Sequence, residues 1–150
     1  MALTNPMNRK LATAIHSCFK LELNFISELE EQEIISEVMR KMKFMRWNEG
    51  HFDGKIHNYR EYLASNLSQL PRVNELMNRV SDFMMGKEIL PVHILELRHD
   101  GKILPHIDNI EYSGSIIAGL SLQRDSILTL SDSVESESIL LPRRSFYRQT

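Results

Sequence analysis

The sequence predicts an α+β fold in which helices come first and antiparallel strands follow. Apolar residues recur at helical spacing in two segments before Gly86, and apolar and polar residues alternate after it. The Asp100-Gly101 pair between two apolar runs is typical of a tight hairpin turn. A run of helices followed by a run of strands is typical of the α+β class.

Two helices are expected. Ser27 and Glu30 form a Ser-x-x-Glu capping box, so a first helix begins there and continues to about Trp47. A second helix is expected from about Pro71 to Gly86, a residue that suits the position after a helix. Its apolar face consists of Val73, Leu76, Met77, Val80, Phe83 and Met84.

The segment between the helices, residues 47–63, contains two glycines and indicates a loop or a short extended stretch. Several of its side chains are aromatic or imidazole rings. They either frame a pocket or pack the first helix on a sheet, and packing is the more common arrangement. These residues are Trp47, His51, Phe52, His57 and Tyr59.

The second half of the chain predicts a run of strands. Residues 92–98 and 103–108 are expected to pair across a turn at 99–102. Further strands are expected at 115–123, 126–132 and 137–142, and a polar, acidic loop at 131–138.

Composition and charge indicate a globular protein and argue against several other classes of protein. The chain has 150 residues, 42% of them hydrophobic and 25% charged, as expected of one globular domain. The formal net charge of −2 argues against nucleic-acid binding, because phosphate contacts need a basic face. No apolar run reaches the roughly 18 residues that span a bilayer. Cys18 is the single cysteine, so no internal disulfide framework is expected.

Residues 1–21 contain no acidic residue. Arg9, Lys10 and Lys20 are interleaved with hydroxyl and apolar side chains, as in an amphipathic mitochondrial presequence. The segment therefore predicts mitochondrial targeting, with a disordered basic N-terminus as the alternative. Residues 22–150 are expected to form the folded domain.

His106 and Asp108 are the candidate site. On the expected strand they stand at positions i and i+2, so their side chains point to one face. An imidazole nitrogen and a carboxylate oxygen on one face supply two of the three protein ligands of a facial triad for non-heme Fe(II). A hydrogen-bonded structural pair is the alternative for so short a motif.

Three segments provide context for this pair. Residues 51–61, 93–130 and 140–147 resemble, in this order, the AlkB-like Fe(II)/2-oxoglutarate-dependent dioxygenases, most closely their mitochondrial member. The resemblance extends from about Leu23 to Tyr147. It implies N-terminal helices packed on a double-stranded β-helix, or jelly-roll, core. It also implies a mitochondrial matrix location.

The resemblance implies that the protein oxidatively decarboxylates 2-oxoglutarate with O2 and couples this reaction to oxidation of an unknown substrate other than DNA. The family link is to programmed necrosis and fatty-acid metabolism. His106 and Asp108 are implied as Fe(II) ligands, and Tyr147 as a residue that helps to bind 2-oxoglutarate. No catalytic residue beyond the metal ligands is expected.

The sequence departs from the family pattern after Leu141. The family places a second iron-binding histidine, and an arginine that pairs with 2-oxoglutarate, beyond the tyrosine that Tyr147 matches. Neither stands between Tyr147 and Thr150. We therefore expect the C-terminal strands of the fold to be missing, iron binding to be weak and turnover to be low. Pro142-Arg143-Arg144-Ser145 stands where relatives have Pro-Gly-Ser, and an arginine in a position that favours glycine predicts strain in this turn.

Three hypotheses follow. The first is a mitochondrial Fe(II)/2-oxoglutarate-dependent dioxygenase. The second is a catalytically inactive binding or regulatory protein that keeps the fold. The third is a soluble α+β domain whose His-x-Asp pair is structural, and the extent of the resemblance argues against it.

Overall fold

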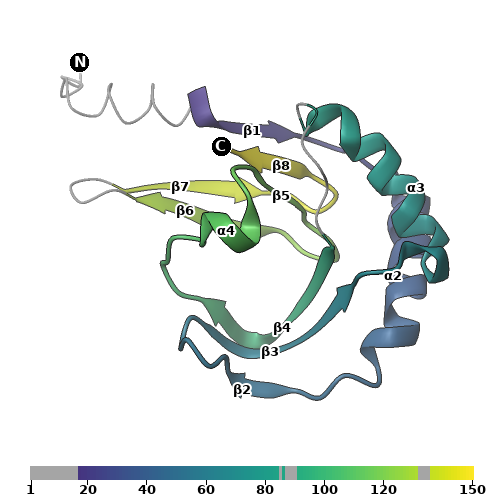
Figure 1. Ribbon diagram of the computed structural model, residues 1–150, viewed down its shortest axis with the longest axis horizontal. Helices are drawn as coiled ribbons and strands as arrows, with labels where there is room; N and C mark the ends of the chain where they lie inside the picture. The colour runs from purple at the N-terminus through teal and green to yellow at the C-terminus, as the bar shows by residue number, and fades with distance from the viewer. Residues whose placement is uncertain (1–16, 85, 87–90, 132–135) are drawn as a thin grey trace. The chain divides into compact units, whose positions relative to one another are not determined.

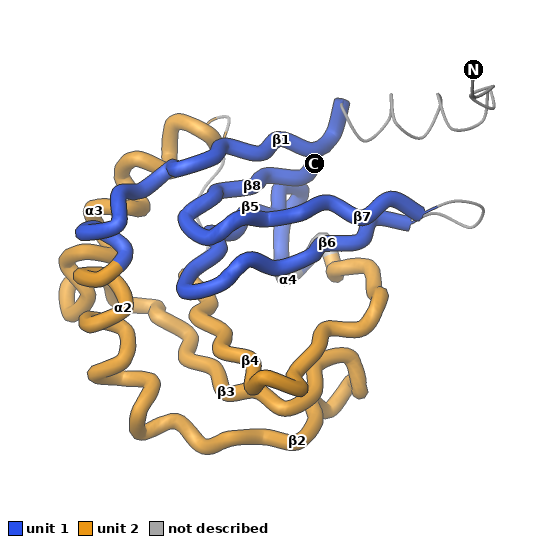
Figure 2. Tube along the Cα trace, turned by 180° about the vertical axis from the view of Figure 1, so that it is seen from behind, with its two compact units in different colours: residues 1–31, 110–150 blue, residues 32–109 orange. Residues whose placement is uncertain are grey.

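A computed structural model describes residues 17–84, 86, 91–131 and 136–150 (Figure 1). Most of the predicted targeting segment and residues 132–135 of the predicted acidic loop lie outside the described residues. The chain divides into two compact units (Figure 2). Unit 1 comprises residues 1–31 and 110–150, and unit 2 comprises residues 32–109. The predicted mixed α+β class is confirmed.

The two predicted helices are present as α2 (Glu28–Met42) and α3 (Pro71–Val80). The capping box is confirmed, because the Ser27 amide donates to Glu30 Oε2 over 2.7 Å and the Glu30 amide donates to Ser27 Oγ over 3.2 Å. Helix α2 ends at Met42, earlier than predicted. Short 3-10 turns, η1 (Leu67–Gln69) and η2 (Ser81–Phe83), flank α3. Unit 2 buries apolar side chains of both helices, namely Ile34, Val38, Met42, Val73, Leu76 and Val80.

Unit 2 also contains an antiparallel sheet with the order β2-β3-β4. Its strands are β2 (Asn48–Gly50), β3 (Ile56–Ala64) and β4 (Val92–Ile103). Residues 47–63 were predicted to form a loop or a short extended stretch, and most of them are extended, in a strand longer than expected. Strand β3 has nine residues and pairs along most of its length with β4. That pairing joins residues 28 to 47 positions apart in the chain, which a local pattern does not reveal.

The predicted hairpin at residues 99–102 was also wrong. Asp100 and Gly101 lie inside β4, where the register with β3 shifts between His57, paired with Lys102, and Tyr59, paired with Leu97. The extra residues form a bulge opposite Asn58. The bulge is tight, because a Cβ on Gly101 would lie 2.6 Å from the Asn58 carbonyl oxygen. The Asp-Gly pair thus turns the backbone without reversing the strand.

Unit 1 contains a sheet with the order β1-β8-β5 and a separate hairpin, β6-β7. The strands predicted at residues 115–123, 126–132 and 137–142 correspond to β5 (Ile117–Leu120), β6 (Ser126–Ser131) and β7 (Ser136–Leu141). The patterns did not predict β1 (Phe19–Glu22), β8 (Phe146–Gln149) or the short helix α4 (Ile110–Ser113). Each has four residues, too few to show a period.

The core of unit 1 forms around buried Phe19 and Leu141. Side chains of β1, β6, β7 and β8 pack against them, namely Leu21, Leu128, Leu130, Ile139 and Tyr147. The first strand and the last strand of the described chain therefore belong to one core. In the part of the chain that the structure describes, no helix is long and apolar enough to cross a membrane.

Candidate functional site

His106 and Asp108 lie in the loop that follows β4, so their predicted placement on a strand was wrong. Strand β4 ends at Ile103, and the Leu104 amide makes one more bond, to the Lys55 carbonyl, over 2.7 Å. Pro105 has no N–H and cannot continue the ladder. The two side chains nevertheless converge, with His106 Nε2 at 3.4 Å from Asp108 Oδ1. The His106 side chain is 32% exposed and that of Asp108 is 41% exposed, so solutes can reach both.

A backbone contact fixes which ring nitrogen of His106 carries a proton. Nδ1 lies 2.8 Å from the Leu104 carbonyl oxygen, which can only accept a hydrogen bond, so Nδ1 is the donor. In the neutral ring, Nε2 then presents a lone pair to the Asp108 carboxylate. Two acceptors face each other unless the ring is protonated or a cation lies between them. Histidines that bind metals use this arrangement, because the second N–H orients the ring.

The spacing of the two donors fits one metal ion. Neighbouring ligands of a six-coordinate ion with bonds of about 2.1 Å are about 3 Å apart. The separation of 3.4 Å between Nε2 and Oδ1 is close to that value. Within the described ranges, no group of three or more His, Cys, Asp or Glu side chains is arranged to hold a metal ion. The pair thus fits as two ligands of a set.

Asp53, in the turn between β2 and β3, is a second acidic group of this region. The pKa of the Asp53 carboxyl is lowered, first by the hydrogen bond from the Lys55 amide (2.9 Å) and then by His51, whose Nδ1 lies 2.8 Å from Asp53 Oδ1. The charge of His106 also contributes to this lowering. Asp53 and His106 therefore interact electrostatically within unit 2. The Asp53-Gly54 pair, which is typical of a turn, is the sequence signal that marks this residue.

The aromatic-rich residues of the segment 47–63 have different environments. Tyr59 is buried, and burial raises the pKa of its hydroxyl, with further contributions from the carboxylates of Glu61 and Asp53. Phe52 is 95% exposed, although its ring contacts that of His51 at 4.3 Å between centroids. The Trp47 ring contacts the guanidinium groups of two arginines, Arg60 and Arg98. Tyr59 is thus a core side chain, whereas Phe52 has no place in the core.

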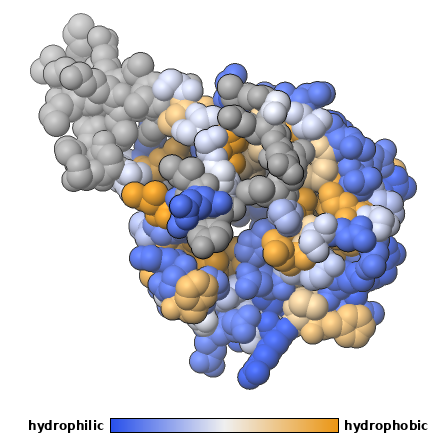
Figure 3. All heavy atoms as spheres, in the orientation of Figure 1, coloured by the Kyte–Doolittle hydropathy of each residue, from blue (hydrophilic) through white to orange (hydrophobic). Residues whose placement is uncertain are grey.

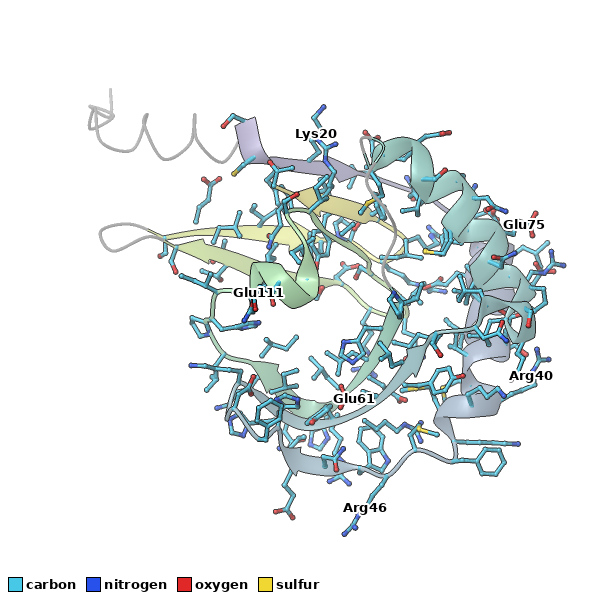
Figure 4. The ribbon with its side chains drawn as sticks, viewed as in Figure 1. Lys20, Arg40, Arg46, Glu61, Glu75 and Glu111 are labelled. Atoms are coloured by element: carbon cyan, nitrogen blue, oxygen red, sulfur yellow. The ribbon has the colours of Figure 1, made fainter. Side chains whose placement is uncertain are left out.

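Two further histidines of unit 2 lie near carboxylates, His93 near Glu61 and His99, at 4.0 Å, near Asp100. His93 Nε2, on β4, lies 2.6 Å from Glu61 Oε2 on β3, and Figure 4 labels Glu61. His99, in the bulge, has an 89% exposed side chain, as expected of a solvated turn residue.

Tyr147, the predicted 2-oxoglutarate residue, lies on β8 in unit 1, between Leu21 of β1 and Gly119 of β5. Its ring stacks on Phe19 with 5.8 Å between centroids. A Cβ on Gly119 would lie 2.5 Å from the Tyr147 ring, so a larger residue there would force the ring to shift. This close approach gives a reason for glycine at position 119.

The turn before β8 is anchored by a buried carboxylate. Glu31 is fully buried, and its Oε1 accepts from the Gln123 amide over 2.7 Å. Its Oε2 accepts from Arg143 Nε over 2.5 Å. The next residue, Arg144, has a φ of 69°, so the strained conformation predicted for this turn is confirmed. No local sequence signal separates Glu31 from the exposed acidic residues around it.

Comparison with known proteins gives the ancestry of the chain. No family model matches it. It is 35% identical over 127 residues to the Mus musculus protein named alpha-ketoglutarate-dependent dioxygenase alkB homolog 7, mitochondrial. That alignment covers 82% of this chain and 58% of the relative. The Bos taurus protein of the same name is 36% identical over 107 residues, which are 71% of this chain and 48% of the relative.

The chain thus spans about half the length of the curated relatives it matches. The identity extends over most of this chain and includes more than the short motifs that suggested the resemblance. By sequence, the chain is therefore similar to the AlkB-like alpha-ketoglutarate-dependent dioxygenases, and both relatives carry the name of the mitochondrial homologue 7.

Proposed function

We propose that this protein takes part in Fe(II)- and 2-oxoglutarate-dependent oxidation, with His106 and Asp108 as ligands of Fe(II). The observation that carries the proposal is the convergence of His106 Nε2 and Asp108 Oδ1 at 3.4 Å, with the Leu104 carbonyl holding the other ring nitrogen. The names of its relatives support 2-oxoglutarate as co-substrate.

Each residue has a separate task in this proposal. The Leu104 carbonyl keeps the proton on Nδ1 and thereby leaves Nε2 free to bind the metal. The Asp108 carboxylate supplies negative charge and an oxygen ligand. Bound Fe(II) supplies a centre at which O2 and 2-oxoglutarate react. Tyr147 contributes a hydrogen bond to 2-oxoglutarate.

The proposal extends to location and substrate. The relatives are named mitochondrial, and the acid-free segment 1–21 supports import into the mitochondrial matrix. The strands support a jelly-roll-like, double-stranded β-helix core. The net charge of −2 supports a substrate other than DNA. The implied link to programmed necrosis and fatty-acid metabolism supports a protein or metabolite of the mitochondrion as substrate.

Anaerobic titration of the purified chain with Fe(II) in the presence of 2-oxoglutarate, followed by calorimetry, tests the site. We expect His106→Ala and Asp108→Ala each to weaken Fe(II) binding at least about tenfold, because each removes a direct ligand. Tyr147→Phe should weaken 2-oxoglutarate binding and leave Fe(II) binding unchanged.

His99→Ala and Asp82→Ala remove the same kinds of side chain from exposed positions and serve as matched controls. Both should bind Fe(II) like the parent chain. Equal affinity of the parent chain and His106→Ala would remove His106 as a ligand and leave the pair with a structural role.

A further inference from the structure

A basic segment comprises the last turn of helix α2 and the turn that follows it in unit 2. From Arg40 to Trp47 the sequence reads RKMKFMRW, which has four basic residues and no acidic one. Its exposed side chains, those of Arg40, Lys43, Phe44 and Arg46, are called the basic turn below. The chain as a whole has a net charge of −2, so this density of positive charge is local.

The backbone of the turn is ordered by hydrogen bonds at the end of the helix. The Lys43 amide donates to Met39 (3.1 Å), and the Met45 amide donates to Met42 (2.9 Å). Met42 is buried, whereas Phe44 is 75% exposed. A large apolar side chain therefore projects into solvent from a fixed turn.

The far end of the turn is held on the sheet. The Trp47 ring makes cation–π contacts with two guanidinium groups, that of Arg60 at 4.6 Å from the ring centroid and that of Arg98 at 4.9 Å. Arg60 is in turn paired with Glu96 on β4 over 2.7 Å. The residues between Met42 and Trp47 are thus fixed at both ends and cannot fold Phe44 into the core without breaking these contacts.

The positive charges of the turn are mostly uncompensated. Among the residues that the structure describes, neither Lys43 nor Arg46 forms an ion pair, and Lys43 Nζ instead lies 4.9 Å from the Phe44 ring centroid. Arg40 lies 3.9 Å from Glu37, a carboxylate already bonded to two backbone amides. Figure 4 shows Arg40 and Arg46 pointing away from the ribbon. In the space-filling view, the surface at the lower right is mostly hydrophilic, with an apolar group at its edge (Figure 3).

We propose that the basic turn attaches the protein to an anionic phospholipid surface. Clustered Lys and Arg beside an exposed aromatic ring are what an acidic bilayer recognises, since the cations contact phosphates and the ring enters the headgroup layer. Attachment at a surface needs no membrane-spanning helix. Single-stranded RNA is the less favoured polyanion, because Lys43 covers a face of Phe44 on which a base would stack.

Co-sedimentation of the full chain with vesicles tests this proposal without iron or substrate. We expect binding to vesicles of equal parts phosphatidylcholine and phosphatidylserine, no binding to phosphatidylcholine alone, and loss of binding as salt is raised. Lys43→Glu combined with Arg46→Glu should lower the binding constant more than about tenfold, and Phe44→Ser should lower it about fivefold or more.

Two matched variants test whether vesicle binding depends on the basic turn itself or only on the net charge of the protein. Lys20→Glu with Lys102→Glu makes the same charge change at exposed residues elsewhere and should lower binding far less. Lys43→Arg with Arg46→Lys keeps the charge and should bind like the parent. An equal loss of vesicle binding in the two charge-reversal variants, Lys43→Glu/Arg46→Glu and Lys20→Glu/Lys102→Glu, would overturn the proposal. So would retention of vesicle binding in the Phe44 and Lys43/Arg46 variants, or tight binding of polyuridine with no binding to acidic vesicles.

Discussion

Arg144 holds a backbone conformation that favours glycine. Its φ is 69°, and its amide donates to the Ser121 carbonyl over 2.7 Å, which keeps the residue in place. The Arg144 side chain adds little stabilisation to offset this strain. Its buried Nε lacks a hydrogen-bond partner among the described residues, and its guanidinium group is 3.9 Å from Glu28. Neighbouring Arg143 differs, since its side chain pairs with the buried Glu31.

We expect Arg144→Gly to raise the free energy of unfolding by about 0.5 kcal/mol, because relief of the left-handed strain outweighs the added chain entropy of glycine. Urea denaturation measures the change. Arg143→Gly, the matched variant one residue earlier, should lower the free energy by about 2 kcal/mol, since it leaves Glu31 buried without its cation. Changes of the same sign in both variants would contradict this assignment.

At the scale of elements, helix α3 depends on helix α2 for its first turn. Leu70 precedes α3 and supplies no side-chain cap, and Pro71 has no N–H to satisfy. The next two amides donate to Glu37 of α2, from Arg72 to Oε1 and from Val73 to Oε2, each over 3.0 Å. A buried carboxylate at this position also interacts favourably with the helix dipole.

Glu37→Ala should therefore lower the free energy of unfolding by about 2 kcal/mol, because two amides at the start of α3 lose their acceptor. Hydrogen exchange of the Arg72 and Val73 amides should speed up together with this loss. Glu75→Ala removes a mostly exposed carboxylate that also pairs with Arg72, and should change the free energy by less than about 0.5 kcal/mol. Equal effects would mean that Glu37 is not a cap.

At the scale of the whole molecule, Tyr59 links stability to alkaline pH. Burial, followed by the charges of Glu61 and Asp53, raises the pKa of its hydroxyl above the ordinary value of about 10. The folded protein therefore holds this proton more tightly than the unfolded chain. The resulting stability is complete below about pH 10 and is lost as pH rises from there towards the folded pKa.

We expect the free energy of unfolding, measured by urea denaturation at increasing pH, to fall above about pH 10. Tyr59→Phe should flatten this decline, because phenylalanine has no proton to lose. Tyr62→Phe leaves Tyr59 intact and should keep the parent slope. A parent-like decline in Tyr59→Phe would assign the alkaline transition to other groups.

The sequence predicted those features whose causes lie within a few residues. The capping box at Ser27 depends on a contact three positions away, and the strands at 126–132 and 137–142 on local alternation. The approach of His106 and Asp108 was also expected, although the reason differed. The two side chains meet in a loop, where the Leu104 carbonyl holds the imidazole, and not on a strand.

Tertiary structure decided the features whose partners are far apart in the chain. Strand β1 exists because residues 19–22 pair with residues 146–149. The Asp100-Gly101 pair forms a bulge, not a hairpin, because β3 occupies the hydrogen-bonding edge of β4. Glu31 and Glu37 are buried because amide and guanidinium groups from distant segments meet them. Local propensity and spacing carry no information about such partners, since only the folded chain brings together the donor and the acceptor, or the two strands, that determine these conformations.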